Sequence, residues 1–295
     1  MPTRRQAIQT LSSLTMLPHL PNFAFGETMF SNDDFDKLLD GTKTFLAQRG
    51  YKNVPPKSLL TNDTFNDGVC FDDTRERYPS GKWYSVQPAS RVEDYNRESE
   101  TGVLPYFHIL SLHNSENTTF DGLLRLMLTY LTKQCRLDPA RLVITSTSLF
   151  KPYLNALPEY GMKETQFFER DLTQAKAQGD GSGFFNPKGL PHLNGGYPTA
   201  AFDYVMTSDT PIKNKTYPLK GALEIGEIRI AEDPKQTINP QSGGFGLERL
   251  LLAMGKPGIR YEDSRRSAMT AMRDQSEATG KALPIAYGKL AKSRS

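Results

Sequence analysis

The chain has 295 residues and a mass of 33.1 kDa, a length that suits one large domain or two small ones. Apolar residues make up 37% and charged residues 23%, a composition that excludes a largely disordered chain. Two cysteines exclude a multi-cysteine zinc site, and no apolar run reaches the roughly 18 residues of a membrane span. The net charge of +3 is too small to indicate a nucleic-acid partner.

Three parts of the chain differ in composition. The first begins with Arg4-Arg5 and continues with the weakly apolar stretch from Ala7 to Phe25. This segment is similar to a twin-arginine export signal with a loose cleavage site before Gly26, and the alternative is an N-terminal helix with a basic start. The last 40 residues carry nine Lys and Arg against four Asp and Glu. We therefore divide the chain into an N-terminal extension (1–32), a body (33–260) and a basic C-terminal tail (261–295).

Helical spacing of apolar residues marks three segments of the body. From Phe35 to Leu46 the spacing predicts a helix that stops at Gly50. A second helix is predicted from Phe120 to Leu131, ending before Asp138-Pro139. A third is predicted over Leu247–Met254, opened by the glycines at 243, 244 and 246.

Strands are predicted between these helices. Trp83–Val86 and Tyr106–Leu110 are joined by a polar segment, which predicts an antiparallel hairpin. Two further strands are predicted at Phe202–Met206 and Leu223–Ile230, and the Gly- and Pro-rich residues 179–198 are predicted as loop.

The predicted hairpin places an arginine beside an aromatic ring. Arg91 follows the first strand, and Phe107 lies in the second. A guanidinium can neutralise a phosphate while a ring stacks on a base, so the pair suits a nucleotide. The alternative is structural: Arg91 would pair with Glu93 or Asp94, and Phe107 would belong to the core.

Two later segments also suit a phosphate ligand. Strand alternation predicts Glu224, Gly226 and Ile228 on one face of their strand, with Glu227 and Arg229 on the other. Glutamates are suitable magnesium ligands, although both could instead be surface charges on an edge strand. The glycine-rich residues from 242 to 246 predict a turn that admits a ligand closely, and Arg249 in the following helix can bind a terminal phosphate.

In their order, these segments resemble the catalytic domain of class II aminoacyl-tRNA synthetases, most closely the alanyl type. The likeness runs from about Phe35 to Gly255. It implies an α+β fold with an antiparallel β-sheet flanked by helices, binding ATP and Mg²⁺ and joining an amino acid to AMP as an aminoacyl-adenylate. The motif-like segments are Phe45–Tyr51 with Val54–Leu59, Ser85–Arg91 with Phe107–Leu110, and Gly244–Arg249.

The resemblance assigns roles in ATP binding. Arg91 would hold the α-phosphate and the amino-acid carboxylate, and Phe107 would stack on adenine. Arg249 would lie on the other side of the base and reach the γ-phosphate, with Gly246 beside the nucleotide. Glu224 would bind magnesium, with Glu227 as a weaker candidate. The two catalytic residues would be Arg91 and Arg249.

Departures from the family pattern concern the phosphate and the amino acid. Val103 stands where the family has His or Arg, so one phosphate contact is missing. Ser242 replaces an aspartate that holds the substrate's amino group, and Asp203 replaces an asparagine. We therefore predict an amino-acid site with Asp203, Ser242 and Gly244, whose substrate need not be alanine.

The predicted hairpin connection, residues 92–101, bears on the acceptor of the activated amino acid. It contains four acids and one base, and an acidic loop would repel RNA. The sequence also ends soon after the last motif, without the tRNA-binding and editing domains of alanyl enzymes. We therefore expect a cytoplasmic ligase, homodimeric through its first motif, that passes an amino acid to a small molecule, peptide or carrier protein and makes no contact with tRNA or membrane.

Two alternatives remain open for this function. One is a minimal aminoacyl-tRNA synthetase that uses the basic tail to bind tRNA. The other is a non-catalytic paralogue that binds a nucleotide or amino acid and regulates a partner. For the compartment, the alternative is export through the N-terminal segment.

Overall fold

A computed structural model of the protein describes residues 32–60, 80–116, 119–178, 199–206, 221–230 and 241–292. The export-signal hypothesis for residues 1–26 and the loop prediction for residues 179–198 lie outside these ranges. Within them, no helix combines the length and the apolar character that a membrane span requires.

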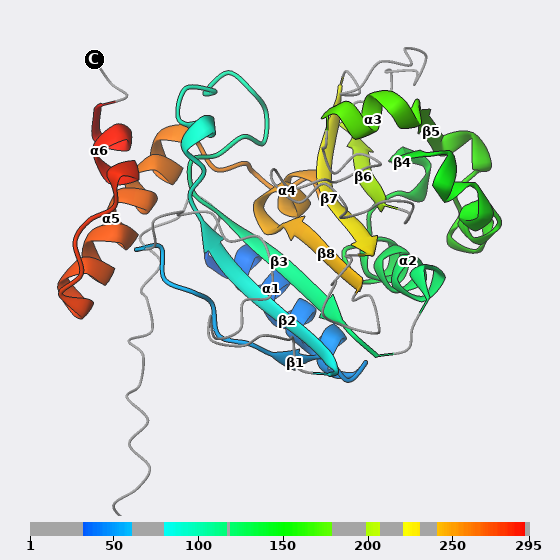
Figure 1. Ribbon diagram of the computed structural model, residues 1–295, viewed down its shortest axis with the longest axis horizontal. Helices are drawn as coiled ribbons and strands as arrows, with labels where there is room; N and C mark the ends of the chain where they lie inside the picture. Colours follow the sequence, from blue (N-terminus) through cyan, green and yellow to red (C-terminus); the bar gives the residue numbers. More distant parts are fainter. Residues whose placement is uncertain are drawn as a thin grey trace, which may run out of the picture.

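One mixed sheet dominates the described residues, and the predicted α+β fold is confirmed. Its eight strands lie in the order β1-β2-β3-β8-β7-β6-β4-β5 (Figure 1). The neighbours from β2 to β4 pair antiparallel, as predicted, whereas β1 and β5 pair parallel at the two edges. The strands are β1 (Lys52–Asn53), β2 (Lys82–Ala89), β3 (Phe107–Asn114), β4 (Leu142–Thr147), β5 (Phe167–Arg170), β6 (Thr199–Val205), β7 (Ala222–Ile230) and β8 (Gln241–Gly246).

Helices α1, α2 and α4 pack their apolar sides against one face of this sheet and form the main hydrophobic core. The α-helices are α1 (Asn32–Ala47), α2 (Phe120–Thr129), α3 (Leu172–Gln178), α4 (Leu247–Ala253), α5 (Tyr261–Thr279) and α6 (Ile285–Lys292). A π-helical turn follows α2 (Tyr130–Gln134). The 3-10 segments are η1 (Val92–Asp94), η3 (Pro139–Arg141), the longer η4 (Ser148–Tyr160) and η5 (Glu164–Gln166).

The three predicted helices form where apolar spacing placed them. The chain leaves α1 through Gly50, whose φ of +80° favours a residue without a Cβ. At the start of α2, the Thr119 hydroxyl accepts a hydrogen bond from the Gly122 backbone N–H at 3.2 Å, an N-cap that satisfies one free amide. The π-helical turn ends before Asp138, as predicted.

The predicted hairpin of β2 and β3 is confirmed and is longer than expected. Its register pairs Lys82 with Asn114 at one end and Ala89 with Phe107 at the other. On the core side, Leu110 and Leu112 of β3 are buried against the helices. The opposite face carries polar and apolar side chains that do not belong to the main hydrophobic core, namely Trp83, Ser85, Gln87, Phe107, Ile109, Ser111 and His113.

The glycine-rich segment before α4 is a strand, and its prediction as a turn was wrong. Residues Gln241–Gly246 form β8 between β3 and β7, and only Gly246 acts as the N-cap of α4. The glycines here permit close packing within the sheet. A Cβ on the neighbouring Gly226 would lie 2.3 Å from the Phe245 ring, which is fully buried.

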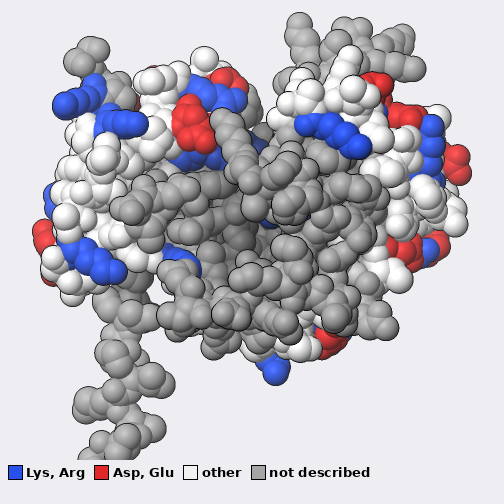
Figure 2. All heavy atoms as spheres, in the orientation of Figure 1, with Lys and Arg blue, Asp and Glu red and all other residues white. Residues whose placement is uncertain are grey.

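The predicted basic tail contains two helices, α5 and α6, which lie beside the loop that connects β2 to β3 (Figure 1). They form a second hydrophobic cluster with the chain before and after β2. Its buried members are Leu59, Tyr95, Ala268, Met272, Ala286 and Leu290. On the face shown in Figure 2, basic side chains predominate over this part of the molecule.

Candidate functional site

The end of the β2–β3 hairpin at which the loop connects the two strands brings Arg91 and Phe107 together, as the sequence predicted. Because Ala89 pairs with Phe107, the chain leaves β2 directly beside the start of β3. The Arg91 guanidinium carbon lies 5.8 Å from the centre of the Phe107 ring. The Arg91 side chain is 33% exposed, so a ligand can reach it.

The alternative prediction, in which Arg91 pairs with an acidic residue of its own loop, is also confirmed in part. Its Nε lies 3.9 Å from a carboxylate oxygen of Asp94 in η1. The Asp94 side chain is only 4% exposed, and its other oxygen lies 2.8 Å from Nη1 of Arg97. Burial raises the pKa of Asp94, whereas Arg91, Arg97 and Arg249 act to lower it. Asp94 is thus a buried carboxylate with three guanidinium groups around it.

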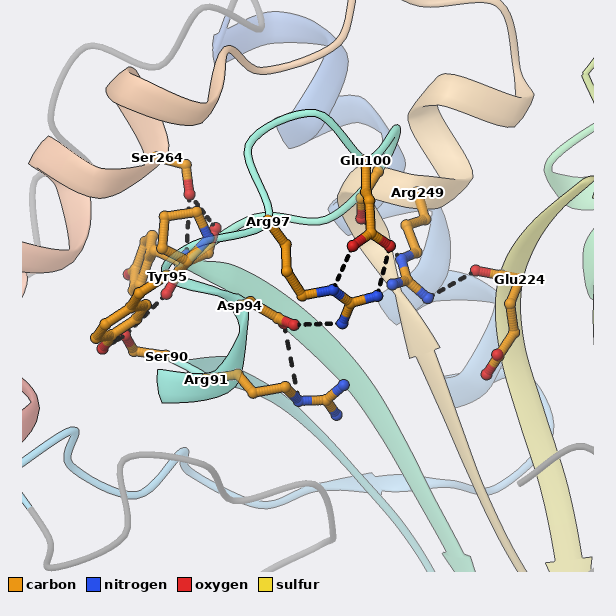
Figure 3. Close-up of polar contacts among 12 residues, drawn as sticks. Ser90, Arg91, Asp94, Tyr95, Arg97, Glu100, Glu224, Arg249 and Ser264 are labelled. Carbon is orange, nitrogen blue, oxygen red and sulfur yellow. Dashed lines mark hydrogen bonds and ion pairs between the residues drawn. The ribbon is translucent and has the colours of Figure 1, made fainter. Parts of the chain in front are cut away.

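Helix α5 supports this loop from the side. The Tyr261 hydroxyl donates to the Asp94 backbone carbonyl at 2.8 Å. The Ser264 hydroxyl lies 2.9 Å from the Tyr106 backbone N–H and 2.8 Å from its carbonyl oxygen (Figure 3). Residues predicted as a tail therefore fix the position of the chain just before Phe107.

Arg249 connects three elements at the same end of the sheet. From α4 its Nε donates to the Gly102 carbonyl at 2.9 Å, and its Nη1 donates to the Glu224 carbonyl of β7 at 2.9 Å (Figure 3). Gly102 adopts φ +75°, and a Cβ there would lie 2.5 Å from Leu223. The loop can approach Arg249 this closely because position 102 is a glycine.

A buried carboxylate fixes α4 to β3. Glu248, which precedes Arg249, accepts a hydrogen bond from the His108 backbone N–H at 2.9 Å and lies 2.7 Å from its Nδ1. Both side chains are buried. The first turn of α4, and Arg249 with it, is therefore held in a defined position on the sheet.

A bulge in β7 changes the predicted faces of its glutamates. Glu224 pairs with Asp203, but Gly226 pairs with Phe202, so the chain gains one residue at Ile225. Residues opposite each other in an antiparallel pair point to the same face, which puts Glu224 beside Asp203. Glu227 pairs with Ala201, two residues from Asp203, and shares this face. The prediction that Glu224 and Glu227 lie on opposite faces was therefore wrong.

Asp203 is a buried acid in the middle of this face. Its side chain accepts a hydrogen bond from the Thr145 hydroxyl at 2.6 Å, and the residue is 3% exposed. Burial raises its pKa to about 7, while the Thr145 hydrogen bond lowers it, Glu224 raises it and Arg249 lowers it. A carboxyl group in this state can bind a cationic group that enters the site.

Ser242 and Gly244 lie on β8 between the hairpin and β7. The Ser242 hydroxyl accepts a hydrogen bond from Nε of Arg229 at 3.0 Å. Gly244 pairs with Ser111 on one side and with Glu227 on the other. On β2, Ser85 pairs with Ser111 of β3. The Ser85 hydroxyl is buried and has no hydrogen-bond partner among the described residues.

Sequence reasoning missed Thr145, Ser85 and the role of α5. Nothing in the local pattern around Thr145 or Ser85 distinguishes them from other strand residues, because their importance comes from their neighbours on other strands. Val103 is buried, as its side chain suggests, and brings no charge to the site.

Glu224 and Glu227 could together supply two carboxylate ligands to a magnesium ion. Among the described residues, no group of three or more His, Cys, Asp and Glu side chains is arranged to hold a metal. Glu224 and Glu227 share one face, and the backbone carbonyl of Glu224 accepts a hydrogen bond from Arg249. Mg²⁺ is commonly held by one or two carboxylates together with substrate phosphates, so this donor set suits a metal that arrives with a nucleotide.

Solved structures that are similar to this chain in fold include two aminoacyl-tRNA synthetases. No protein-family model and no curated protein matches the sequence. The apo histidyl-tRNA synthetase of S. aureus is 12% identical with a TM-score of 0.43, over 78% of this chain and 68% of that one. The aspartyl-tRNA synthetase of Entamoeba histolytica is 13% identical with a TM-score of 0.40, over 78% of this chain and 56% of that one. Neither is of the alanyl type, and likenesses at this level assign no activity.

Proposed function

We propose that the protein activates an amino acid with ATP, forming an aminoacyl-adenylate and pyrophosphate. The observation that carries the proposal is the convergence of Arg91, Phe107 and Arg249 at one end of the sheet, beside a face that bears Asp203 and Glu224. Cationic groups and an aromatic ring suit a nucleoside triphosphate, and a carboxyl group suits the ammonium group of an amino acid. The two substrates would thus meet near Arg249.

In the proposed reaction, the amino-acid carboxylate attacks the α-phosphorus and pyrophosphate leaves. Arg91 binds the α-phosphate and the attacking carboxylate, and Arg249 binds the γ-phosphate. Phe107 stacks on adenine, and Gly246 lets the nucleotide approach the sheet. The nucleophile is already ionised, so no general base is needed, and catalysis consists of positioning and charge stabilisation. A magnesium ion held by Glu224 and Glu227 would supply neutralisation of the phosphate charge.

The amino acid is proposed to lie against β6 and β8. Asp203 would bind its ammonium group, with Ser242 and Gly244 forming the adjoining wall. The support is positional: Asp203 is the buried acid of this face, and Thr145 holds one of its oxygens. The open second oxygen of a carboxylate can accept from an ammonium group.

For the acceptor, we favour a small molecule, a peptide or a carrier protein over tRNA. Residues 92–101 carry four acids and only one base, Arg97. The loop therefore offers acidic groups to its surroundings, which disfavours a phosphate backbone. A homodimer and a cytoplasmic location, where ATP is available, belong to the same proposal.

A non-catalytic relative is the second candidate, and the buried Val103 favours it. Without a cation at this position, one phosphate contact of the family pattern is lost. Such a protein would bind a nucleotide or an amino acid but would not exchange pyrophosphate.

The decisive experiment is amino-acid-dependent exchange of labelled pyrophosphate into ATP, with each proteinogenic amino acid in turn. Exchange with one or a few amino acids is the expected result. Absence of exchange with all of them, together with measurable ATP binding, would support the non-catalytic candidate. Charging of added bulk tRNA would overturn the choice of acceptor and favour a minimal synthetase.

A further inference from the structure

The loop between β2 and β3 contains an arginine whose position the proposed reaction leaves unexplained. Arg97, Arg91 and Arg249 all act electrostatically on Asp94, and Figure 3 shows Arg97 between Asp94 and Glu100, with the other two guanidinium groups nearby. Arg97 Nη1 is 2.8 Å from Asp94 Oδ1. Its Nε and Nη2 donate to the two oxygens of Glu100 at 2.7 and 2.6 Å.

The two carboxylates that hold Arg97 differ in their environment. Asp94 is almost fully buried and is fixed through its own backbone carbonyl by Tyr261. Glu100 is 50% exposed, and the Arg97 side chain is 43% exposed. Exposed ion pairs contribute little to stability, so the Glu100 contact can be given up at small cost, whereas the Asp94 contact keeps Arg97 in place.

The exposed contact resembles the contact that a phosphate would make. Glu100 offers two oxygens to Nε and Nη2 of Arg97 in a bidentate arrangement. Phosphate oxygens match the same fork of donors and carry more charge. Between residues 92 and 106 Arg97 is the only basic residue, and Val103 is buried.

We propose that Arg97 is a third phosphate-binding arginine, and that Glu100 occupies it until a nucleoside triphosphate takes its place. Asp94 positions both Arg91 and Arg97 and keeps its contacts in both states. This inference rests on the proposed ATP site. It adds that the loop senses the terminal phosphates, because Arg97 exchanges partners only when a ligand brings enough negative charge.

The test compares the binding of ATP and AMP by calorimetry to the full chain and to single variants. Arg97→Ala should weaken ATP binding roughly ten- to hundredfold, the loss typical of a charge-assisted hydrogen bond, and should leave AMP binding unchanged. Arg97→Lys should recover part of the ATP affinity. Glu100→Gln should strengthen ATP binding severalfold, because it removes the competing charge without removing Arg97.

Arg125→Ala is the matched control. Arg125 also bridges two carboxylates, Asp121 and Glu159, but it lies on α2 at the opposite face of the sheet. Its variant should bind both nucleotides like the wild type. Thermal unfolding of each variant shows whether it is folded, and the exposed Glu100→Gln keeps the test valid if Arg97→Ala is unstable.

The outcomes separate this inference from the proposed function. If the wild type binds ATP and Arg97→Ala binds it equally well, the inference is wrong and the proposed function stands. An unchanged or weaker ATP affinity of Glu100→Gln would also overturn it. If the wild type binds no ATP at all, the proposed function fails and takes the inference with it.

Discussion

At the scale of single residues, Arg91 and Arg249 play different structural parts. Arg91 lies in a partly exposed contact with Asp94, whereas Arg249 ties the loop to β7 through two backbone carbonyls. The same side chain of Arg249 therefore serves the fold and the proposed phosphate site. Loss of either arginine should affect the reaction, but only the loss of Arg249 should also affect stability.

We predict that Arg91→Ala and Arg249→Ala each reduce the rate of pyrophosphate exchange about 10²–10³-fold, as the loss of one charge-stabilising donor does in other enzymes. Thermal unfolding should show Arg91→Ala folded like the wild type. Arg249→Ala should lose stability because the Gly102 and Glu224 carbonyls lose a donor. Near-full exchange activity in either variant would show that this arginine is not part of the site.

The raised pKa of Asp203 predicts how stability depends on pH. The unfolded chain releases this proton near pH 4, whereas the folded chain keeps it until pH 7. Between these values the folded state binds more protons, so the contribution of Asp203 to stability falls as pH rises. The variant Asp203→Asn should lose this decrease in stability with rising pH. Denaturant unfolding at pH 5 and pH 8 measures the free energy of unfolding for both proteins. A decrease that persists in the variant would contradict this assignment.

The same group predicts a change in substrate affinity. An ammonium group binds the ionised carboxylate, so the amino-acid KM should rise as pH falls below 7, while the ATP KM changes little. Asp203→Asn should raise the amino-acid KM far more than the ATP KM at pH 8. Exchange kinetics with each substrate varied in turn measure both constants, and equal effects on the two would contradict the pocket assignment.

At the scale of elements, the close contact of β7 and β8 determines the shape of the site face. Gly226 lies where a side chain would meet both the Phe245 ring and the Gly244 carbonyl oxygen. The bulge at Ile225, one residue earlier, then places Glu224 on the same face as Asp203. Packing of one strand against the next therefore decides which carboxyl groups face the proposed substrates.

Gly226→Ala should destabilise the protein by about 1–3 kcal/mol, the usual cost of overpacking a core. The new methyl group would be 2.5 Å from a backbone oxygen that cannot move alone. Gly288 in α6 is the control, because nothing lies within 4 Å of its Cβ position. Gly288→Ala should stabilise the helix by about 0.5–1 kcal/mol. Denaturant unfolding distinguishes the two, and equal effects would show that β7 and β8 are less tightly packed.

Helix α5 illustrates why an element far along the chain belongs to the site. Tyr261 and Ser264 hold the backbone on both sides of the loop that carries Arg97. The buried members of the second cluster place α5 and α6 against Leu59 and Tyr95. The helix thus links the loop to a core of its own, separate from the main core under the sheet.

At the scale of the whole molecule, the proposed reaction predicts the compartment in which the protein acts. We expect the full-length chain to fractionate with cytosolic markers, because the proposed reaction needs ATP. If residues 1–26 are a structural segment and not a signal, their deletion should destabilise the protein. A reporter fused to residues 1–30 should not be exported. Export that stops when Arg4 and Arg5 are changed to Lys, with processing near Gly26, would contradict this expectation and weaken the ATP proposal.

The sequence by itself was enough for elements whose residues interact locally. Apolar spacing predicted α1, α2 and α4, and the two strands with a polar connection predicted the β2–β3 hairpin. The neighbouring positions of Arg91 and Phe107 followed from that hairpin, because the register of an antiparallel pair is determined by its turn and its pattern.

The tertiary structure decided what depends on neighbours distant in the chain. The glycines before Leu247 form a strand because β3 and β7 lie on both sides of them, and the faces of Glu224 and Glu227 depend on a bulge against β6. The influence of Arg249 on Asp94, and the hydrogen bond of Tyr261 in α5 to Asp94, also join residues more than 100 positions apart. Such contacts arise from packing and pairing between elements, and local periodicity carries no information about them.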